Sequence, residues 1–215
     1  KNIQELAFRF FNDKSKSSGI MFGRFGNGEP LLYTQLSGNF LVGSVIKAKS
    51  SSGLIFTKES FNSSPDLFYD SGEFAIQEFD AAMNRKETSV SLSSINPQQK
   101  DYNWGTAELY KWKAFNGKMS EGVLYKPEDF KPKKKYPLLM YFYETHSDEV
   151  NTYIPPTPTG SRLNISFFVS RGYVVFCPDI RYTNGHPAKS CYDYVVSAAQ
   201  DLAKQKWIDA KNIGI

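Results

Sequence analysis

The spacing of apolar residues changes after Pro127, and this change constrains the fold more than any other feature of the chain. In about the first hundred residues, short apolar or alternating runs are separated by turn-forming residues, a pattern typical of β-strands. After Pro127, continuous apolar runs alternate with stretches of helical periodicity, which is typical of a parallel sheet covered by helices. The 215 residues therefore predict two regions of different structural class.

The first region is expected to form strands that recur about every ten residues. This spacing suits a sandwich or about two four-stranded blades of a β-propeller, and no internal repeat decides between them. The predicted strands are residues 31–33, 45–48, 54–57, 67–69 and 74–76, and the predicted turns are residues 26–28, 50–53 and 70–72. The aromatic side chains expected in the core are Phe10, Phe11, Phe22, Phe25 and Phe56.

Asn116 and Gly117 form the strongest local turn signal in the chain. Asn-Gly is the dipeptide that best suits a type I′ turn, because both central residues of that turn take a positive φ. The flanking runs, 108–115 and 118–125, are therefore expected to pair as a hairpin. One face of its first strand is expected to carry Tyr110, Trp112 and Ala114.

After Pro127 the residues predict the element order β, α, β, α, β. The predicted strands are residues 138–143, 173–177 and 212–215, and the predicted helices are residues 163–171 and 191–206. Gly172 is expected to end the first helix, and Ser190 with Asp193 suits a capping box at the start of the second. The buried face of the second helix is expected to carry Cys191, Val195, Ala198 and Leu202.

The composition argues against nucleic acid and membranes as partners. Lys and Arg total 26 against 22 Asp and Glu, and a formal charge of +4 is too small to indicate nucleic-acid binding. The one basic cluster, at 131–135, is expected to be a solvated turn. The longest apolar run, 138–143, is far shorter than the roughly 20 residues of a spanning helix. The chain shows no secretory leader and does not begin with Met, so we interpret it as part of a longer protein.

No complete catalytic constellation is present in the sequence. A serine hydrolase of the α/β type needs a Gly-x-Ser-x-Gly turn that lifts the nucleophile above the sheet, and this motif is absent from the 215 residues. P-loop, GxGxxG, HExxH and EF-hand motifs are absent as well. His146, Asp148 and Glu149 stand close together, but without a second cluster they are expected to be solvated and to bind no metal.

Short segments from about Asp66 onward carry a resemblance to a known family. They are Ser-Pro-Asp-Leu-Phe at 64–68, Phe-Asn-Gly at 115–117, Glu-Gly-Val-Leu-Tyr-Lys-Pro at 121–127, Lys-Tyr-Pro-Leu-Leu-Met-Tyr-Phe-Tyr at 135–143, Arg-Gly-Tyr-Val-Val at 171–175, Asp-Ile-Arg at 179–181, Asp-Tyr-Val at 193–195 and Trp-Ile-Asp-Ala-Lys-Asn-Ile-Gly-Ile at 207–215. In this order they resemble the prolyl oligopeptidase family of serine peptidases, and its dipeptidyl-peptidase and acylaminoacyl-peptidase branches are the most similar.

The resemblance implies an α+β two-part fragment: the C-terminal blades of a β-propeller, residues 1–104, followed by the N-terminal half of an α/β-hydrolase domain, residues 105–215. It implies hydrolysis of short peptides through an acyl-enzyme, with no metal or organic cofactor. In that family a Gly-x-Ser-x-Gly-Gly turn follows a segment like 212–215. The catalytic Ser, Asp and His are therefore expected beyond Ile215, and the fragment alone is expected to be inactive.

One catalytic position is implied within the chain. In the dipeptidyl-peptidase branch, a tyrosine at the end of the strand matching 135–143 donates its hydroxyl to the oxyanion, and the matching residue is Tyr143. The family continues with Gly-Gly-Pro or Ala-Gly-Pro, whereas this chain continues with Glu-Thr-His at 144–146. Tyr143 is therefore expected to be either an oxyanion donor or a plain tyrosine at the end of a strand.

The loop after the second predicted strand carries Asp179 and Arg181, which the resemblance places near the site. Arg181 is a candidate substrate-binding residue, and a structural salt link or turn is the alternative for both side chains. Gly185 and His186 belong to the same loop and carry the same two alternatives.

Other functions and properties stay open at this stage. The alternatives to a peptidase are a non-catalytic propeller-containing binding protein that has lost its triad, which residues 144–146 favour, and an esterase of the same fold. The compartment is expected to be periplasmic or secreted, self-association is left open, and a severed sheet is expected to aggregate or to need a partner chain. Cys177 and Cys191 either pair or stay as free thiols.

Overall fold

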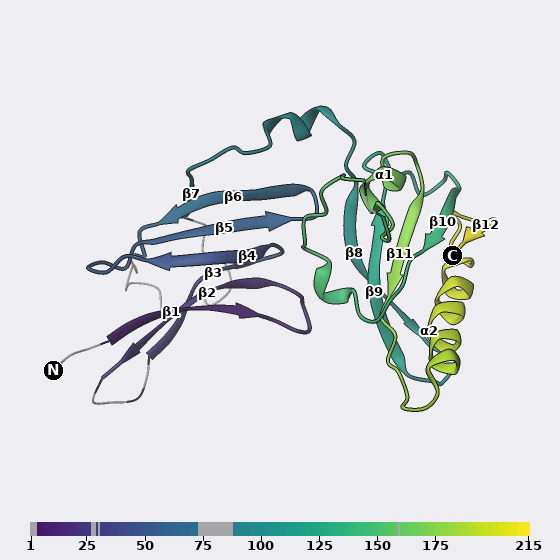
Figure 1. The fold of residues 1–215 in the computed structure, drawn as a ribbon, viewed down its shortest axis with the longest axis horizontal. Coiled ribbons are helices and arrows are strands. Elements are labelled where there is room, and N and C mark those ends of the chain that lie inside the picture. The colour runs from purple at the N-terminus through teal and green to yellow at the C-terminus, as the bar shows by residue number, and fades with distance from the viewer. Residues whose placement is uncertain (1–3, 27–28, 30, 73–87, 159) are drawn as a thin grey trace. The chain divides into compact units, whose positions relative to one another are not determined.

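The computed structural model describes residues 4–26, 29, 31–72, 88–158 and 160–215 (Figure 1). The predicted strand at 74–76 and residues 27 and 28 of the first predicted turn lie outside the described residues. The chain divides into two compact units, residues 1–97 with 151–153 and residues 98–150 with 154–215. Within the described residues, no helix is long and apolar enough to cross a membrane.

The first unit consists of two antiparallel sheets in which strand order follows chain order (Figure 1). The three-stranded sheet contains β1 (Gln4–Phe11), β2 (Ser18–Phe25) and β3 (Leu31–Gly38), and the four-stranded sheet contains β4 (Leu41–Lys47), β5 (Leu54–Ser60), β6 (Ser63–Asp70) and β7 (Val90–Ser91). The expected β pattern is confirmed, and the strands predicted between residues 31 and 69 correspond to β3, β4, β5 and β6. β1 and β2 are not among the predicted strands, although their phenylalanines give them a β-forming composition.

The two sheets of the first unit share one hydrophobic core. Its buried residues are Ile20, Phe22, Leu36, Val42, Leu54 and Phe56. Of the five phenylalanines expected in a core, Phe22 and Phe56 are buried, Phe10 and Phe25 are half-buried and Phe11 is exposed at the end of β1. A buried polar contact adds to the packing, since Gln35 Nε2 donates a 2.7 Å hydrogen bond to the carboxylate of Asp70 and links β3 to β6.

The second unit is built on a mixed five-stranded sheet of order β12-β10-β11-β9-β8. Its strands are β8 (Thr106–Lys113), β9 (Met119–Lys126), β10 (Tyr136–Met140), β11 (Val174–Pro178) and β12 (Ile208–Gly214). β10 runs parallel to both β11 and β12, whereas β9 runs antiparallel to β11 and β8. The predicted order β, α, β, α, β from β10 onward is confirmed.

The predicted hairpin is confirmed as β8 and β9, but its predicted turn type is wrong. Gly117 has a φ of +81°, whereas among the described residues other than glycine only Lys16 has a positive φ, so Asn116 does not meet the type I′ requirement. Gly117 N donates to Ala114 O, and Ala114 N donates to Lys118 O, each at 2.9 Å. These bonds describe a three-residue loop in which a single left-handed glycine completes a type I turn.

Helices cover both faces of the centre of the sheet. α2 (Pro187–Leu202) packs on the face that carries Leu124, Val174 and Phe176. α1 (Ile165–Val169) contacts β11 and β9. Alternate residues of those strands, including Val175, are also fully buried, so the centre of the sheet has the double coverage that its continuous apolar runs predicted.

The predicted start of the second helix is wrong, whereas its buried face is confirmed. α2 begins at Pro187, a favoured first helical residue, and not after Ser190. Ser190 lies inside the first turns, where its hydroxyl donates to the carbonyl of His186 at 2.9 Å, so it forms no capping box. Residues Val195, Ala198 and Leu202 are buried, and Cys191 packs against the same core.

The first helix, α1, is shorter than the predicted range of residues 163–171. Asn164 caps α1, since its side-chain oxygen accepts a 3.1 Å hydrogen bond from Phe167 N. Gly172 follows the helix with a φ of +84°, as expected for a terminating glycine.

Candidate active site

The candidate site lies where the chain leaves the carboxyl ends of β10 and β11. From β10 the chain proceeds to β11 on one side and then to β12 on the other side of β10, so the strand order reverses at β10. Ligands of open α/β sheets bind at the carboxyl ends of strands beside such a reversal. Two segments meet at this edge, residues 141–149 after β10 and residues 179–186 after β11.

Tyr143 lies outside the sheet, and the expectation that the strand reaches this residue is wrong. β10 ends at Met140, and Tyr141 N still donates to Phe176 O at 3.0 Å before the chain turns away. The turn leads into the short 3-10 helix η2 (Ser147–Glu149). The side chain of Tyr143 is 78% exposed, so its hydroxyl is open to solvent at the predicted edge.

Asp179 lies directly after β11 and joins the two segments of the edge. Its carboxylate is buried, with 6% of the residue exposed, and one oxygen accepts hydrogen bonds from His146 N at 2.6 Å and Ser147 N at 2.8 Å. This contact favours the structural alternative for Asp179 over substrate binding.

Two further bonds connect the same segments. Ile180 N donates to Glu144 O at 2.7 Å, and the hydroxyl of Tyr182 donates to the backbone oxygen of Tyr143 at 2.9 Å. Sequence reasoning missed Tyr182, and its place one residue after Arg181 is the only signal that pointed to it.

His146 is packed under its own loop. Its Nδ1 lies 3.1 Å from a carboxylate oxygen of Glu149, its ring lies 5.7 Å from that of Tyr141, and its buried Nε2 has no hydrogen-bond partner among the described residues. The hydrogen bond from His146 lowers the pKa of Glu149, and the positive charges of His146 and Arg162 add to this effect while burial opposes it. Within the described residues, no group of His, Cys, Asp and Glu side chains is arranged to hold a metal ion.

The edge offers hydrogen-bond donors but no assembled nucleophile and base. His186 is the N-cap residue of α2 and makes no side-chain capping bond. The Nδ1 of His146 is bonded to Glu149 and its Nε2 is buried without a hydrogen-bond partner among the described residues, so this ring is not paired with a serine hydroxyl there. Arg181 is exposed on the loop, where its guanidinium is accessible to a ligand. The exposed hydroxyl of Tyr143 is a donor of the kind that can stabilise an oxyanion, which would form when a nucleophile supplied by another segment attacks a carbonyl group.

The two cysteines are free in the described structure, so the disulfide alternative is not realised. Cys177 is buried in β11, and burial raises the pKa of its thiol, with nearby Glu149 and Asp179 acting in the same direction. A thiol held neutral in this way is a poor nucleophile.

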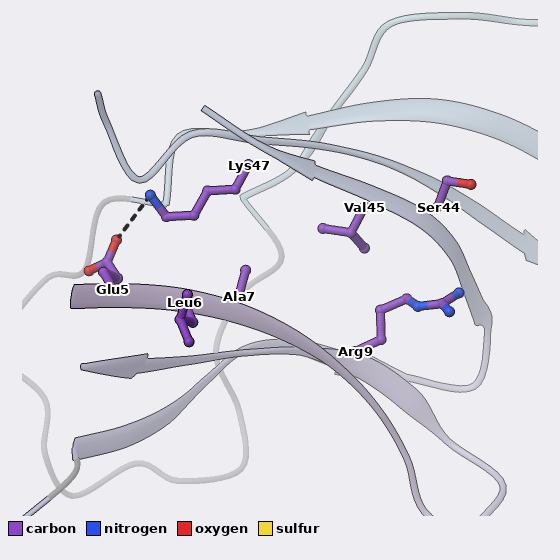
Figure 2. Close-up of a pocket in the computed structure, with 7 residues that line it drawn as sticks. All are labelled: Glu5, Leu6, Ala7, Arg9, Ser44, Val45 and Lys47. Carbon is purple, nitrogen blue, oxygen red and sulfur yellow. Dashed lines mark ion pairs between the residues drawn. The ribbon is translucent and has the colours of Figure 1, made fainter. Parts of the chain in front are cut away.

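A cavity of about 540 Å³ lies in the first unit between β1 and β4 (Figure 2). Glu5 and Lys47 pair across one end at 3.7 Å, and Arg9 lies at the other end, where it donates to Gly43 O at 2.7 Å. Burial opposes ionisation of Glu5, but hydrogen bonds from Arg24 and Ser52 outweigh it and lower the pKa of Glu5. The negative charge of Glu5 is thus already balanced by the neighbouring cations Arg24 and Lys47.

Comparison with known proteins supports the fold. No protein-family model and no curated protein matches the chain. Similar solved structures include the AtxE2 isopeptidase in its apo form (14% identity, TM-score 0.66), the acylaminoacyl peptidase of Pyrococcus horikoshii (16%, 0.54) and a post-proline cleaving enzyme from Rickettsia typhi (13%, 0.56). They align with 99%, 91% and 100% of this chain and with 34%, 31% and 30% of their own.

These similarities cover 91% or more of this chain but only about a third of each similar structure. Prolyl oligopeptidase, acylaminoacyl peptidase and dipeptidyl aminopeptidase IV relatives are among the structures with this likeness. The resemblance noted in the sequence is therefore confirmed at the level of fold.

Proposed function

We propose that this chain is part of a serine peptidase of the prolyl oligopeptidase family that hydrolyses short peptides through an acyl-enzyme. In this proposal, residues 1–104 are propeller blades and residues 105–215 are the first half of an α/β-hydrolase domain. Tyr143 donates its hydroxyl to the oxyanion, Arg181 contacts the substrate, and the catalytic Ser, Asp and His lie beyond Ile215. The two antiparallel sheets of the first unit and the helix-covered sheet of the second support this division.

The register of β12 carries the proposal. β12 pairs in parallel with β10, with Leu138 opposite Ile213 and Leu139 opposite Gly214. Residues that follow Ile215 therefore emerge at the same edge of the sheet as the residues that follow Met140. A nucleophile on a turn directly after β12 would lie beside the loop that carries Tyr143, which is the pairing that acyl transfer requires.

The proposal is tested with a fluorophosphonate probe, which labels activated serines. A longer natural protein that continues past Ile215 is expected to be labelled and to cleave short peptide amides, and the 215-residue chain is expected to do neither. Replacing the serine of the expected Gly-x-Ser-x-Gly motif by alanine is the matched control and should abolish labelling. Labelling of the 215-residue chain itself would contradict the placement of the nucleophile beyond Ile215.

A non-catalytic binding protein is the second candidate. Its supporting observation is the sequence Glu-Thr-His at 144–146, in place of the Gly-Gly-Pro or Ala-Gly-Pro of the family, together with the tight bonding of this loop to Asp179. A longer protein without a serine after β12 would decide for this function. If the longer protein is labelled but hydrolyses simple esters and no peptide amide, the esterase alternative replaces the peptidase.

A further inference from the structure

We propose that Asp179 and Tyr182 are positioning residues that hold Tyr143 in place, so that the loop after β11, and not strand β10, sets the location of the tyrosine hydroxyl. This inference rests on the proposed function for its catalytic consequence, whereas its structural part concerns the 215-residue chain alone.

The sheet does not locate Tyr143. β10 ends at Met140, and the last backbone bond from the sheet is the one that Tyr141 N donates to Phe176 O. Beyond this point the chain has no strand partner, and Tyr143 is exposed. A tyrosine on such a segment needs bonds from another element if its hydroxyl is to occupy one position.

The loop after β11 supplies these bonds at Tyr143 itself and to the residues that follow it. The hydroxyl of Tyr182 donates a hydrogen bond to the backbone carbonyl of Tyr143 itself. Farther along, Ile180 fixes the carbonyl of Glu144, and the Asp179 carboxylate binds two successive amides at the start of η2. On the side of the loop after β11, the donors and acceptors lie within four consecutive residues, 179–182, so this short segment makes all of these contacts.

The strength of these bonds is unequal. Hydrogen bonds to an ionised acceptor are about twice as strong as neutral ones, and the Asp179 carboxylate is shielded from solvent. Tyr182 is partly exposed and makes a single neutral bond. We therefore expect Asp179 to hold the loop and Tyr182 to adjust the position of Tyr143 within it. Catalytic groups need placement within about 0.5 Å, so even a small shift has a kinetic effect.

The structural part is tested by amide hydrogen exchange on the 215-residue chain. Asp179→Ala is expected to speed exchange in residues 143–149 by at least about tenfold, while α2 and β9 keep their protection. Asp179→Asn retains one side-chain oxygen as acceptor and should give an intermediate rate. Asp129→Ala, at an exposed aspartate, is the matched control. Unchanged exchange in residues 143–149 would overturn the inference. If Asp179→Ala loses protection throughout the chain, the same comparison is made with the milder Asp179→Asn variant.

The catalytic part is tested by a double-mutant cycle in the longer protein. Tyr182→Phe is expected to lower kcat about tenfold with little change in KM, and to have no further effect when Tyr143 is already phenylalanine. Tyr192→Phe, at an exposed tyrosine of α2, is the control. Equal losses from Tyr182→Phe in both backgrounds would show that Tyr182 does not act through Tyr143. If Tyr143→Phe alone leaves kcat unchanged, the oxyanion role fails, and the exchange experiment still decides the structural part.

Discussion

The indole nitrogen of Trp112 donates a 2.9 Å hydrogen bond to the hydroxyl of Ser197, which joins β8 to α2 inside the core of the second unit. Both residues are buried. Ser197 in turn donates to the carbonyl of Asp193 at 2.6 Å, so the indole is bound to a hydroxyl whose own proton is already used.

Ser197→Ala leaves the buried indole N–H of Trp112 without a partner. We expect a loss of about 1–3 kcal/mol in the free energy of unfolding, the usual cost of an unsatisfied buried donor. Urea unfolding followed by tryptophan fluorescence measures this change. Ser161→Ala, at an exposed serine, should alter the free energy of unfolding by less than about 0.5 kcal/mol, and equal losses in both variants would contradict the assignment.

Tyr110 gives the second unit a predicted sensitivity to alkali. Burial and the hydrogen bond that its hydroxyl donates to Asp201 raise the pKa of Tyr110 from 10.0 to about 12. Because the folded-state pKa is higher than the unfolded one, the stabilising contribution is complete below the unfolded value and is lost as pH rises through the folded one. The difference in free energy of unfolding between wild type and Tyr110→Phe should therefore shrink from about pH 10 upward. A difference that is independent of pH would argue against this coupling.

The contribution of Glu149 to the free energy of unfolding is expected to be lost in acid, whereas that of Tyr110 is lost in alkali. The hydrogen bond from His146 lowers the pKa of Glu149 below its ordinary 4.5. A lowered folded-state pKa stabilises the fold above the ordinary value, and this contribution is lost as pH falls through the folded-state value. Wild type should exceed Glu149→Gln in stability at neutral pH, and the two should converge in acid. Equilibrium unfolding at several pH values measures the difference, and divergence in acid would contradict a stabilising role of the hydrogen bond between His146 and Glu149.

Phe56 is expected to dominate the core of the first unit. It is buried between the two sheets and stacks on Phe68 with 5.9 Å between ring centroids. Phe56→Ala should cost about 3–5 kcal/mol in the free energy of unfolding through lost burial and a residual cavity. Phe11→Ala removes the same side chain at an exposed position and should cost far less, so similar losses would contradict the packing of the two sheets.

Elements with a strong local pattern were predictable from the sequence. The runs around 138 and 173 read as buried strands because apolar residues are continuous there, and the face of α2 followed from helical spacing. The errors concern the start of α2 and the turn type of the β8–β9 hairpin, where a second local signal also pointed to a structure. Pro187 marks the start of α2 more strongly than Ser190, and a single left-handed glycine at 117 satisfied the hairpin without a second positive φ.

The site was less predictable because its contacts join residues far apart in the chain. Nothing local in the sequence shows that the Asp179 carboxylate binds amides of residues 146 and 147, or that Tyr182 reaches the carbonyl of Tyr143. Tyr143 itself came from a resemblance to a family. Its exposure at the carboxyl edge agrees with that placement, while its catalytic role stays a prediction.

The kinetic effect of Tyr143→Phe in the longer protein tests the central proposal most directly. Removal of one oxyanion donor is expected to lower kcat about 10²–10³-fold while KM changes little, because the hydroxyl acts on charge that develops in the transition state. Tyr192→Phe should retain full kcat. A Tyr143→Phe protein that keeps the wild-type kcat would contradict the assignment of this edge as an oxyanion site.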